Sequence, residues 1–223
     1  MRESLGGMGL LAPTVLILIG LVLYPFFYAI WLAFTDKTVG SPGQFVGFRN
    51  FAYVLAWPQF TTAVWNTVVF TVSAVAMKFV LGMAVALVLN QGIRDAWRNF
   101  PFYAISFLAG MQTISQELYD SAQVDGASRI GQFRHITLPG LYHIIGVVLL
   151  LTTIQTANAF EPIYLLTGGG PSDATMVYTM LVYVMGMMNL RLGEAAAVST
   201  LFLPLLIALV LAVTILLQRK ANA

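Results

Sequence analysis

The 223-residue sequence contains no cysteine and is poor in charge and histidine. The absence of cysteine excludes disulfides, thiolate metal sites and cysteine nucleophiles. Two histidines, His135 and His143, are too few for a histidine-rich metal site. Charged residues make up 9% of the chain, against about 25% in a typical soluble domain, whose surface must be hydrated. The chain therefore has too few charges to cover a water-soluble globule, and we expect its outer surface to face lipid.

Apolar residues are abundant instead and make up 59% of the sequence. A helix needs about 20 mainly apolar residues to cross the hydrocarbon core of a bilayer. Four stretches are long enough, at about residues 8–34, 61–90, 138–160 and 195–217. The first begins like a signal peptide, but it is too long and lacks a small-residue cleavage site, so we interpret it as a retained span. The sequence thus predicts an all-α, polytopic helical bundle with about four transmembrane helices, as a single domain over residues 1–223.

Basic residues predict the orientation of these spans, because cytoplasmic loops are enriched in Lys and Arg. Seven of the eleven fall in segments that would share the cytoplasmic side, namely Arg2, Arg94, Arg98, Arg129, Arg134, Arg219 and Lys220. We therefore expect both termini in the cytoplasm. Because the basic residues are scattered, we expect no nucleic-acid partner. Lys78 lies within the second predicted span, where a pathway or subunit contact and a structural pairing or snorkelling are both open.

Two apolar runs are too short to cross the bilayer as helices. Residues 100–111 have flanks that both look cytoplasmic, so we expect this run to lie at the membrane interface or to pack against neighbouring helices. Residues 176–188 follow TGGGP at 167–171, a strong turn signal. We expect a re-entrant or interfacial helix there, with its methionines used for packing and not for metal binding.

The longest polar segment between predicted spans is QELYDSAQVDGASRIGQFRHITLPG, residues 116–140. Its pattern predicts a short helix at 116–123, a turn at Asp125-Gly126 and a second helix at 127–135. Pro139 falls in the first turn of the following span, where its missing N–H costs nothing. Such a cytoplasmic helix–turn–helix, held against the membrane domain, offers a ridge for docking into a groove on a partner protein.

This segment resembles the EAA loop of the permeases of binding-protein-dependent ABC importers. That pattern is E-A-A, three residues, G, nine residues, I, one residue and L-P. The sequence matches every spacing with Asp120-Ser121-Ala122, Gly126, Ile136 and Leu138-Pro139, where Asp and Ser are conservative replacements. Four short segments resemble sequences of the maltose-type carbohydrate branch of this family, namely ELYD, VDGA, LLTGGGPSDAT and LGEAAAVS.

The chain departs from the family in its middle. Family members usually have six core spans, two of which lie between the second span and the EAA loop. Here RNFPFY (98–103) resembles the approach to the first of these, and AISFLAGMQ (104–112) resembles the end of the second. By this comparison the family core expected between residues 100 and 110 is deleted, which leaves four spans and the same orientation.

The resemblance implies a membrane-spanning permease subunit of an ATP-driven sugar importer, forming part of the translocation pathway in a bacterial or archaeal cytoplasmic membrane. It implies as partners separate ABC ATPase subunits, a second permease subunit and a periplasmic or lipid-anchored sugar-binding protein. The residues implied to couple to the ATPase are Asp120, Ser121, Ala122, Asp125, Gly126 and Ala127. The sequence has no phosphate-binding Gly-Lys-Ser/Thr loop, so we expect no cofactor and no enzymatic activity here, with ATP bound by the partner subunit.

Four side chains towards the outer end of the third predicted span are candidates for the substrate pathway, namely Gln155, Asn158, Glu161 and Tyr164. Sugars are bound by amide and carboxylate hydrogen bonds and by aromatic faces. The same groups also suit hydrogen bonds between membrane helices, and the sequence leaves both roles open.

Two other functions compete with the importer subunit. A four-span remnant could bind the ATPase or the partner permease without forming a pathway, and the missing spans favour this transport-inactive role. A secondary transporter is the third hypothesis, but ion-coupled carriers often carry intramembrane carboxylates, and the predicted spans contain none at mid-depth.

Overall fold

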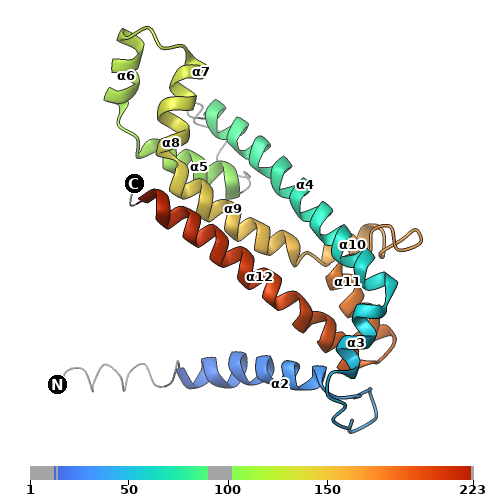
Figure 1. Cartoon of the computed structure of the whole chain (residues 1–223). Coiled ribbons are helices and arrows are strands. Elements are labelled where there is room, and N and C mark those ends of the chain that lie inside the picture. The colour runs from blue at the N-terminus through green and yellow to red at the C-terminus, as the bar shows by residue number, and fades with distance from the viewer. Residues whose placement is uncertain (1–12, 14, 90–101, 222–223) are drawn as a thin grey trace, which may run out of the picture. The chain divides into compact units, whose positions relative to one another are not determined.

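The computed structural model describes residues 15–89 and 102–221, together with residue 13. Its elements within these ranges are α- and π-helices, with one isolated β-bridge between Thr35 and Phe45. In chain order they are η1 (Ile19–Leu23), α2 (Tyr24–Ala33), α3 (Arg49–Ala56), α4 (Pro58–Leu89), α5 (Phe102–Gln112), α6 (Gln116–Val124), α7 (Arg129–Gln132), η2 (Phe133–Thr137), α8 (Leu138–Gly140), α9 (Tyr142–Ala157), α10 (Glu161–Leu166), α11 (Tyr178–Tyr183), η3 (Val184–Met188) and α12 (Leu192–Ala221) (Figure 1). The predicted all-α membrane fold is confirmed. The predictions that concern Arg2, Arg94, Arg98 and the start of the 100–111 run lie outside the described residues.

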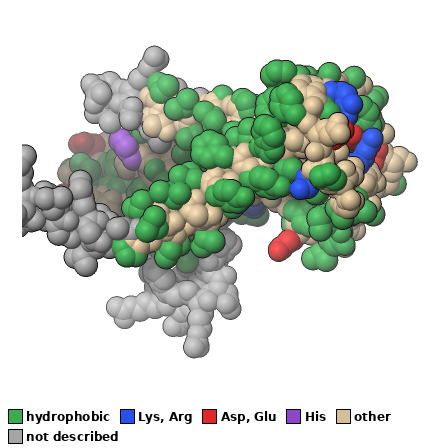
Figure 2. All heavy atoms as spheres, turned by 90° about the horizontal axis from the view of Figure 1, so that it is seen from below, with side chains coloured by type: hydrophobic (Ala, Val, Ile, Leu, Met, Phe, Trp, Pro, Cys, Tyr) green, Lys and Arg blue, Asp and Glu red, His purple; other side chains and the backbone are tan. Residues whose placement is uncertain are grey.

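Two described helices are long and apolar enough to cross a membrane, Val15–Ala33 and Pro58–Leu87. The pair Arg129–Gly140 and Tyr142–Ala157 makes a third if it forms one span with a 69° bend. The fourth predicted span falls within the 30 residues of α12. Figure 2 shows that hydrophobic side chains cover much of the coloured surface on the visible face, as expected of a chain surrounded by lipid.

Within the third predicted span, 138–160, the helix is interrupted at Leu141. The interruption follows Pro139 and Gly140, the two residue types that most weaken a continuous helix. Gly140 is also tightly packed, since a Cβ there would lie 2.7 Å from Cδ1 of Ile114. The chain therefore enters α9 at a steep angle to the polar segment that precedes it.

The chain divides into two compact units, and α4 and α12 contribute to both. The first unit holds residues 1–66 and 160–205, and the second holds 67–159 and 206–223. In the first unit the ring of Tyr178 stacks on that of Phe202 at 3.7 Å. Of the five methionines for which packing is predicted, Met176, Met180 and Met185 are buried there, whereas Met187 and Met188 are exposed.

The second unit has its hydrophobic core around α5, whose Phe107 is fully buried and lies edge-on to Phe79 of α4 at 5.6 Å. Glycines allow the close approach, because a Cβ on Gly82 would lie 2.5 Å from the Cβ of Tyr103, and one on Gly110 would overlap the side chain of Ile144. Of the two predicted placements for the 100–111 run, the structure shows packing against neighbouring helices.

Candidate functional site

Residues 116–139 form the two short helices that the sequence predicts. Helix α6 begins after Ser115, whose hydroxyl accepts a hydrogen bond from the backbone N–H of Glu117 at 3.3 Å. The turn contains Gly126 at φ +78°, a left-handed conformation that favours glycine. Helix α7 starts two residues later than predicted, because Ser128 is its N-cap and its hydroxyl accepts from the N–H of Gly131 at 3.2 Å.

The two helices project with little packing of their own. In Figure 1 they lie at one end of the second unit, beyond the end of α9. Neither α6 nor α7 contains a buried residue. Large apolar side chains are exposed on both, with Val124 88% exposed, Ile130 79% and Leu118 54%. These exposed apolar side chains, together with the turn that follows α6, form a candidate interaction surface, which we call the ridge.

The six predicted coupling residues lie on the last turns of α6 and in the turn that follows it, namely Asp120, Ser121, Ala122, Asp125, Gly126 and Ala127. Ala122 and Ala127 are half-buried, and the N–H of Ala127 donates to the carbonyl of Ala122 at 2.8 Å, which closes the turn. The other four are exposed. Asp120 accepts a hydrogen bond from the amide of Gln116 at 3.2 Å, one helical turn away.

A contact that sequence reasoning missed ties this ridge to the membrane helices. The phenol oxygen of Tyr119 lies 2.9 Å from the hydroxyl oxygen of Thr137, at the end of η2. Thr137 is 4% exposed and directly precedes α8. A hollow of about 680 Å³ lies beside this contact, with Gln123, Arg129 and Phe133 in its wall. The hydrogen bond therefore bridges α6 and η2 at the edge of an open space.

Two of the predicted pathway residues belong to the second unit, Gln155 on α9 and Asn158 as its C-cap. Gln155 lines a mainly apolar cavity of about 540 Å³, together with Lys78 of α4. The ammonium of Lys78 donates to the hydroxyl of Thr156 at 3.0 Å, so this lysine has a structural partner and also faces a cavity. The amide of Asn158 donates to the carbonyl of Ile154 at 2.8 Å, within the last turn of the helix.

The other two predicted pathway residues belong to the first unit. Glu161 is exposed in the first turn of α10. Tyr164 is 44% exposed, and its ring lies 5.1 Å from Phe160 and 5.2 Å from Tyr183. These three rings form an aromatic group that joins the start of α10 to the end of α11. Among the described residues, no three His, Asp or Glu side chains are grouped so as to hold a metal ion.

Comparisons with known proteins find permease proteins of transport systems that are similar along nearly the whole chain. The trehalose/maltose transport system permease protein MalF of Thermococcus litoralis is 26% identical, with 92% of this chain and 91% of that protein covered. The inner membrane ABC transporter permease protein YcjO of Escherichia coli is 28% identical, with 96% and 93% covered. This chain is a homologue of sugar ABC transporter permeases. No family model matches it.

A further sequence relative and a solved structure are also similar to this permease homologue. The sulfoquinovosyl glycerol transport system permease protein SmoG of Agrobacterium fabrum is 27% identical, with 88% of this chain and 85% of that protein covered. A solved bacterial ABC transporter that imports the acidic polysaccharide alginate contains a chain with the same fold. The TM-score is 0.78 at 21% identity, and 98% of the permease homologue and 96% of that chain are covered.

The alignments also show that the permease homologue is shorter than its relatives within the aligned region. The alignment with YcjO runs over 281 positions, whereas the chain has 223 residues, so at least 58 aligned positions face gaps in it. Two membrane helices need about 40 residues, and their connecting loops need more. A shortfall of this size matches the length of two core spans, and the absence of those spans stays a prediction.

Proposed function

We propose that this chain is the membrane-spanning subunit of an ATP-driven, binding-protein-dependent carbohydrate importer, and that residues 116–139 couple it to separate ATPase subunits. The observation that carries the proposal is the exposed ridge of α6 and its following turn, where the side chains of Leu118 and Val124 have no core of their own to join. A ridge with exposed apolar and acidic groups gains most by entering a groove on another protein.

Coupling by this ridge requires that the ATPase subunits contact it differently in their open and closed states. Closure on ATP would then carry the docked ridge with it and switch paired permease subunits between inward- and outward-facing states. The ATPase-coupling residues are Asp120, Ser121, Ala122, Asp125, Gly126 and Ala127. Orientation with both termini in the cytoplasm would put this ridge on the side where ATP is available.

The proposed substrate is a sugar, because the relatives are named for trehalose, maltose and sulfoquinovosyl glycerol. Gln155, Asn158, Glu161 and Tyr164 supply amide, carboxylate and aromatic groups that suit sugar hydroxyls and ring faces. A second permease subunit and a sugar-binding protein complete the proposed importer. The related alginate transporter has been solved in complex with a periplasmic protein that carries an alginate pentasaccharide, which supports such a partner here.

Co-purification with a tagged cognate ATPase subunit tests the coupling assignment. Gly126→Asp places bulk and negative charge on the ridge, and we expect it to abolish retention of the chain. Gly40→Asp is a matched control, because Gly40 also has a positive φ (+88°) and, like Gly126, has open space where a Cβ would be. Equal retention of the two variants would contradict the assignment.

A second function is favoured by the gaps in the alignments. We propose as the alternative a transport-inactive remnant with four spans, which binds the ATPase or the partner permease without forming a pathway. Both functions predict retention by the ATPase. Only the importer restores sugar uptake in cells that lack the full-length homologue, so uptake measured in such cells separates the two.

A further inference from the structure

Five aromatic rings gather at the C-terminal end of the first predicted span, and we call them the aromatic cluster: Trp31, Phe34, Phe45, Phe48 and Phe51. Phe34 lies at the centre, with its ring 5.0 Å from that of Phe51 and 5.3 Å from that of Phe48. Phe45 stacks on Trp31 at 5.6 Å. The cluster thus joins the end of α2, the hairpin that follows it and the start of α3.

Three rings of the cluster are exposed to an extent that is unusual for such large apolar groups. Phe48 is 73% exposed, Phe45 63% and Trp31 53%. A contiguous exposed apolar patch marks a contact with lipid or protein, because water solvates it poorly. The patch continues the apolar surface of the span Val15–Ala33. An apolar stretch of 18 residues within this span has no residue buried against the rest of the described chain.

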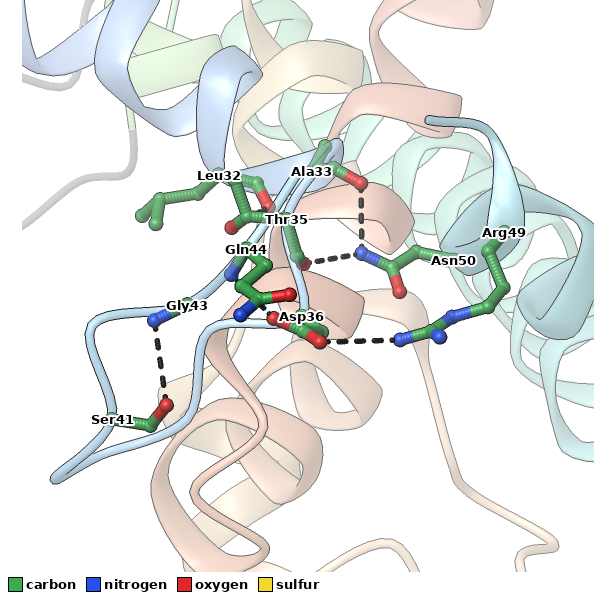
Figure 3. A network of polar contacts seen from close by, with 9 residues as sticks. All are labelled: Leu32, Ala33, Thr35, Asp36, Ser41, Gly43, Gln44, Arg49 and Asn50. Carbon is green, nitrogen blue, oxygen red and sulfur yellow. Dashed lines mark hydrogen bonds and ion pairs between the residues drawn. The ribbon is translucent and has the colours of Figure 1, made fainter. Parts of the chain in front are cut away.

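The exposed rings belong to a loop that is held by a network of polar contacts (Figure 3). The amide of Asn50 donates to the carbonyls of Ala33 at 2.9 Å and Thr35 at 2.7 Å, and this side chain is buried. The two carbonyls lie at the end of α2, where no further helical N–H is available. The carboxylate of Asp36 accepts from the backbone N–H of Gln44 at 2.6 Å and closes the hairpin.

Two cationic residues, Lys37 and Arg49, belong to the same segment of the chain as the rings. The guanidinium of Arg49 is 3.5 Å from the carboxylate of Asp36, and its side chain is 65% exposed. Lys37 donates to the phenol oxygen of Tyr28 at 3.3 Å and lies 6.0 Å from the centre of that ring. Aromatic rings beside exposed Arg and Lys are the composition that membrane interfaces favour, because rings enter the acyl boundary and cations meet lipid phosphates.

We propose that the aromatic cluster is a lipid-interface anchor, inserted at the boundary between headgroups and acyl chains in the leaflet at the C-terminal end of the first span. Phe45, Phe48 and Trp31 face the lipid, while Arg49 and Lys37 remain in the headgroup layer. Because Asn50 fixes the hairpin to the end of α2, the anchor sets the depth of that helix in the bilayer. Lipid is favoured over a protein partner by the continuity of the patch with the apolar surface of the span.

The absence of cysteine makes a direct test practical, since each introduced cysteine is unique. Phe45→Cys and Phe48→Cys are each labelled with an environment-sensitive fluorophore, in the full chain reconstituted into phosphatidylcholine–phosphatidylglycerol vesicles. Ser41→Cys is the matched control, because Ser41 is an exposed polar residue of the same hairpin. We expect blue-shifted emission and quenching by lipids with a nitroxide near the headgroup at positions 45 and 48, and quenching by aqueous iodide at position 41.

Two results would overturn the proposal. Iodide quenching at positions 45 and 48 as strong as at position 41 would place the rings in water. Protection from both iodide and the lipid nitroxide would mean that protein covers them. The two labelled positions lie on different parts of the loop, in the hairpin and at the start of α3, so one decides the question if the other variant does not reconstitute. The test uses no ATPase and no sugar, so its outcome is independent of the proposed function.

Discussion

The phenol oxygen of Tyr119 and the hydroxyl oxygen of Thr137 are 2.9 Å apart, although the residues are 18 positions apart in the sequence. One lies on the inner side of the exposed helix α6, and the other is buried where the chain turns towards α9. This hydrogen bond makes the orientation of the ridge depend on the position of the helix that enters the membrane. Because Thr137 is buried, removal of the Tyr119 hydroxyl leaves the hydroxyl of Thr137 without this partner, at a cost of about 1–3 kcal/mol.

Tyr119→Phe should therefore loosen α6 while it keeps the ring. Spin labels on cysteines introduced at the exposed positions Ser121 and Val147, both in the second unit, report the distance between α6 and α9. We expect a broader distance distribution in Tyr119→Phe and Thr137→Val, and an unchanged one in Thr137→Ser, which keeps a hydroxyl. An unchanged distribution in both hydroxyl-deletion variants would show that the contact does not position the ridge.

The backbone at Gly126 leads to a second prediction. An L-residue with a side chain is strained at φ +78°, and alanine there should cost about 1–2 kcal/mol, whereas asparagine tolerates this region better. We expect thermal unfolding in detergent to rank glycine and asparagine above alanine. Because Gly126→Asn has the shape of Gly126→Asp without its charge, it should bind the ATPase more weakly than the native chain and more tightly than the aspartate variant.

Residues 116–139 are the part of the structure that the sequence predicts best. Spacing alone located α6, the turn at Gly126 and Pro139 at the start of the next helix, because caps, turns and helix periods are local properties. The placement of the 100–111 run stayed open, since an apolar run has the same appearance at an interface and in a core. Only the packing of Phe107 against Phe79 decides between them.

Contacts between distant positions escaped sequence analysis altogether. Nothing in the pattern around Asn50 indicates that its amide bonds to Ala33 and Thr35, which lie 17 and 15 residues earlier. The pairing of Lys78 with Thr156 spans 78 residues. Such contacts depend on how helices pack, and a single sequence by itself carries no record of that packing.

Lys78 and Thr156 supply a third prediction. Thr156→Val should remove the hydroxyl that accepts from the ammonium, and an ammonium in an apolar cavity without a partner is costly, so we expect a loss of about 1–3 kcal/mol. Lys78→Met removes the charge together with the donor and should cost less. If the two side chains interact, Thr156→Val should lower the stability less in a chain that already carries Lys78→Met than it does in the native chain. The free energy of unfolding is measured in detergent for the native chain, the two single variants and the double variant. Strictly additive losses would contradict the contact.

Gly193 provides a last test, of the loop that holds the aromatic cluster. A Cβ at this position would overlap the carbonyl oxygen of Thr35, which already accepts from Asn50, and the N–H of Gly193 donates to the carbonyl of Lys37 at 3.0 Å. Alanine there must push the start of α12 away from the hairpin, so we expect Gly193→Ala to lose about 1–3 kcal/mol of stability, as overpacked sites do. The matched control is Gly20→Ala, because a Cβ on Gly20 meets nothing within 4 Å and alanine favours the helix. Gly20→Ala should leave the unfolding temperature equal or raised.

Because the clash displaces the hairpin, Gly193→Ala should also red-shift the emission of a fluorophore at position 48. A global loss of stability alone would not cause this shift below the unfolding temperature.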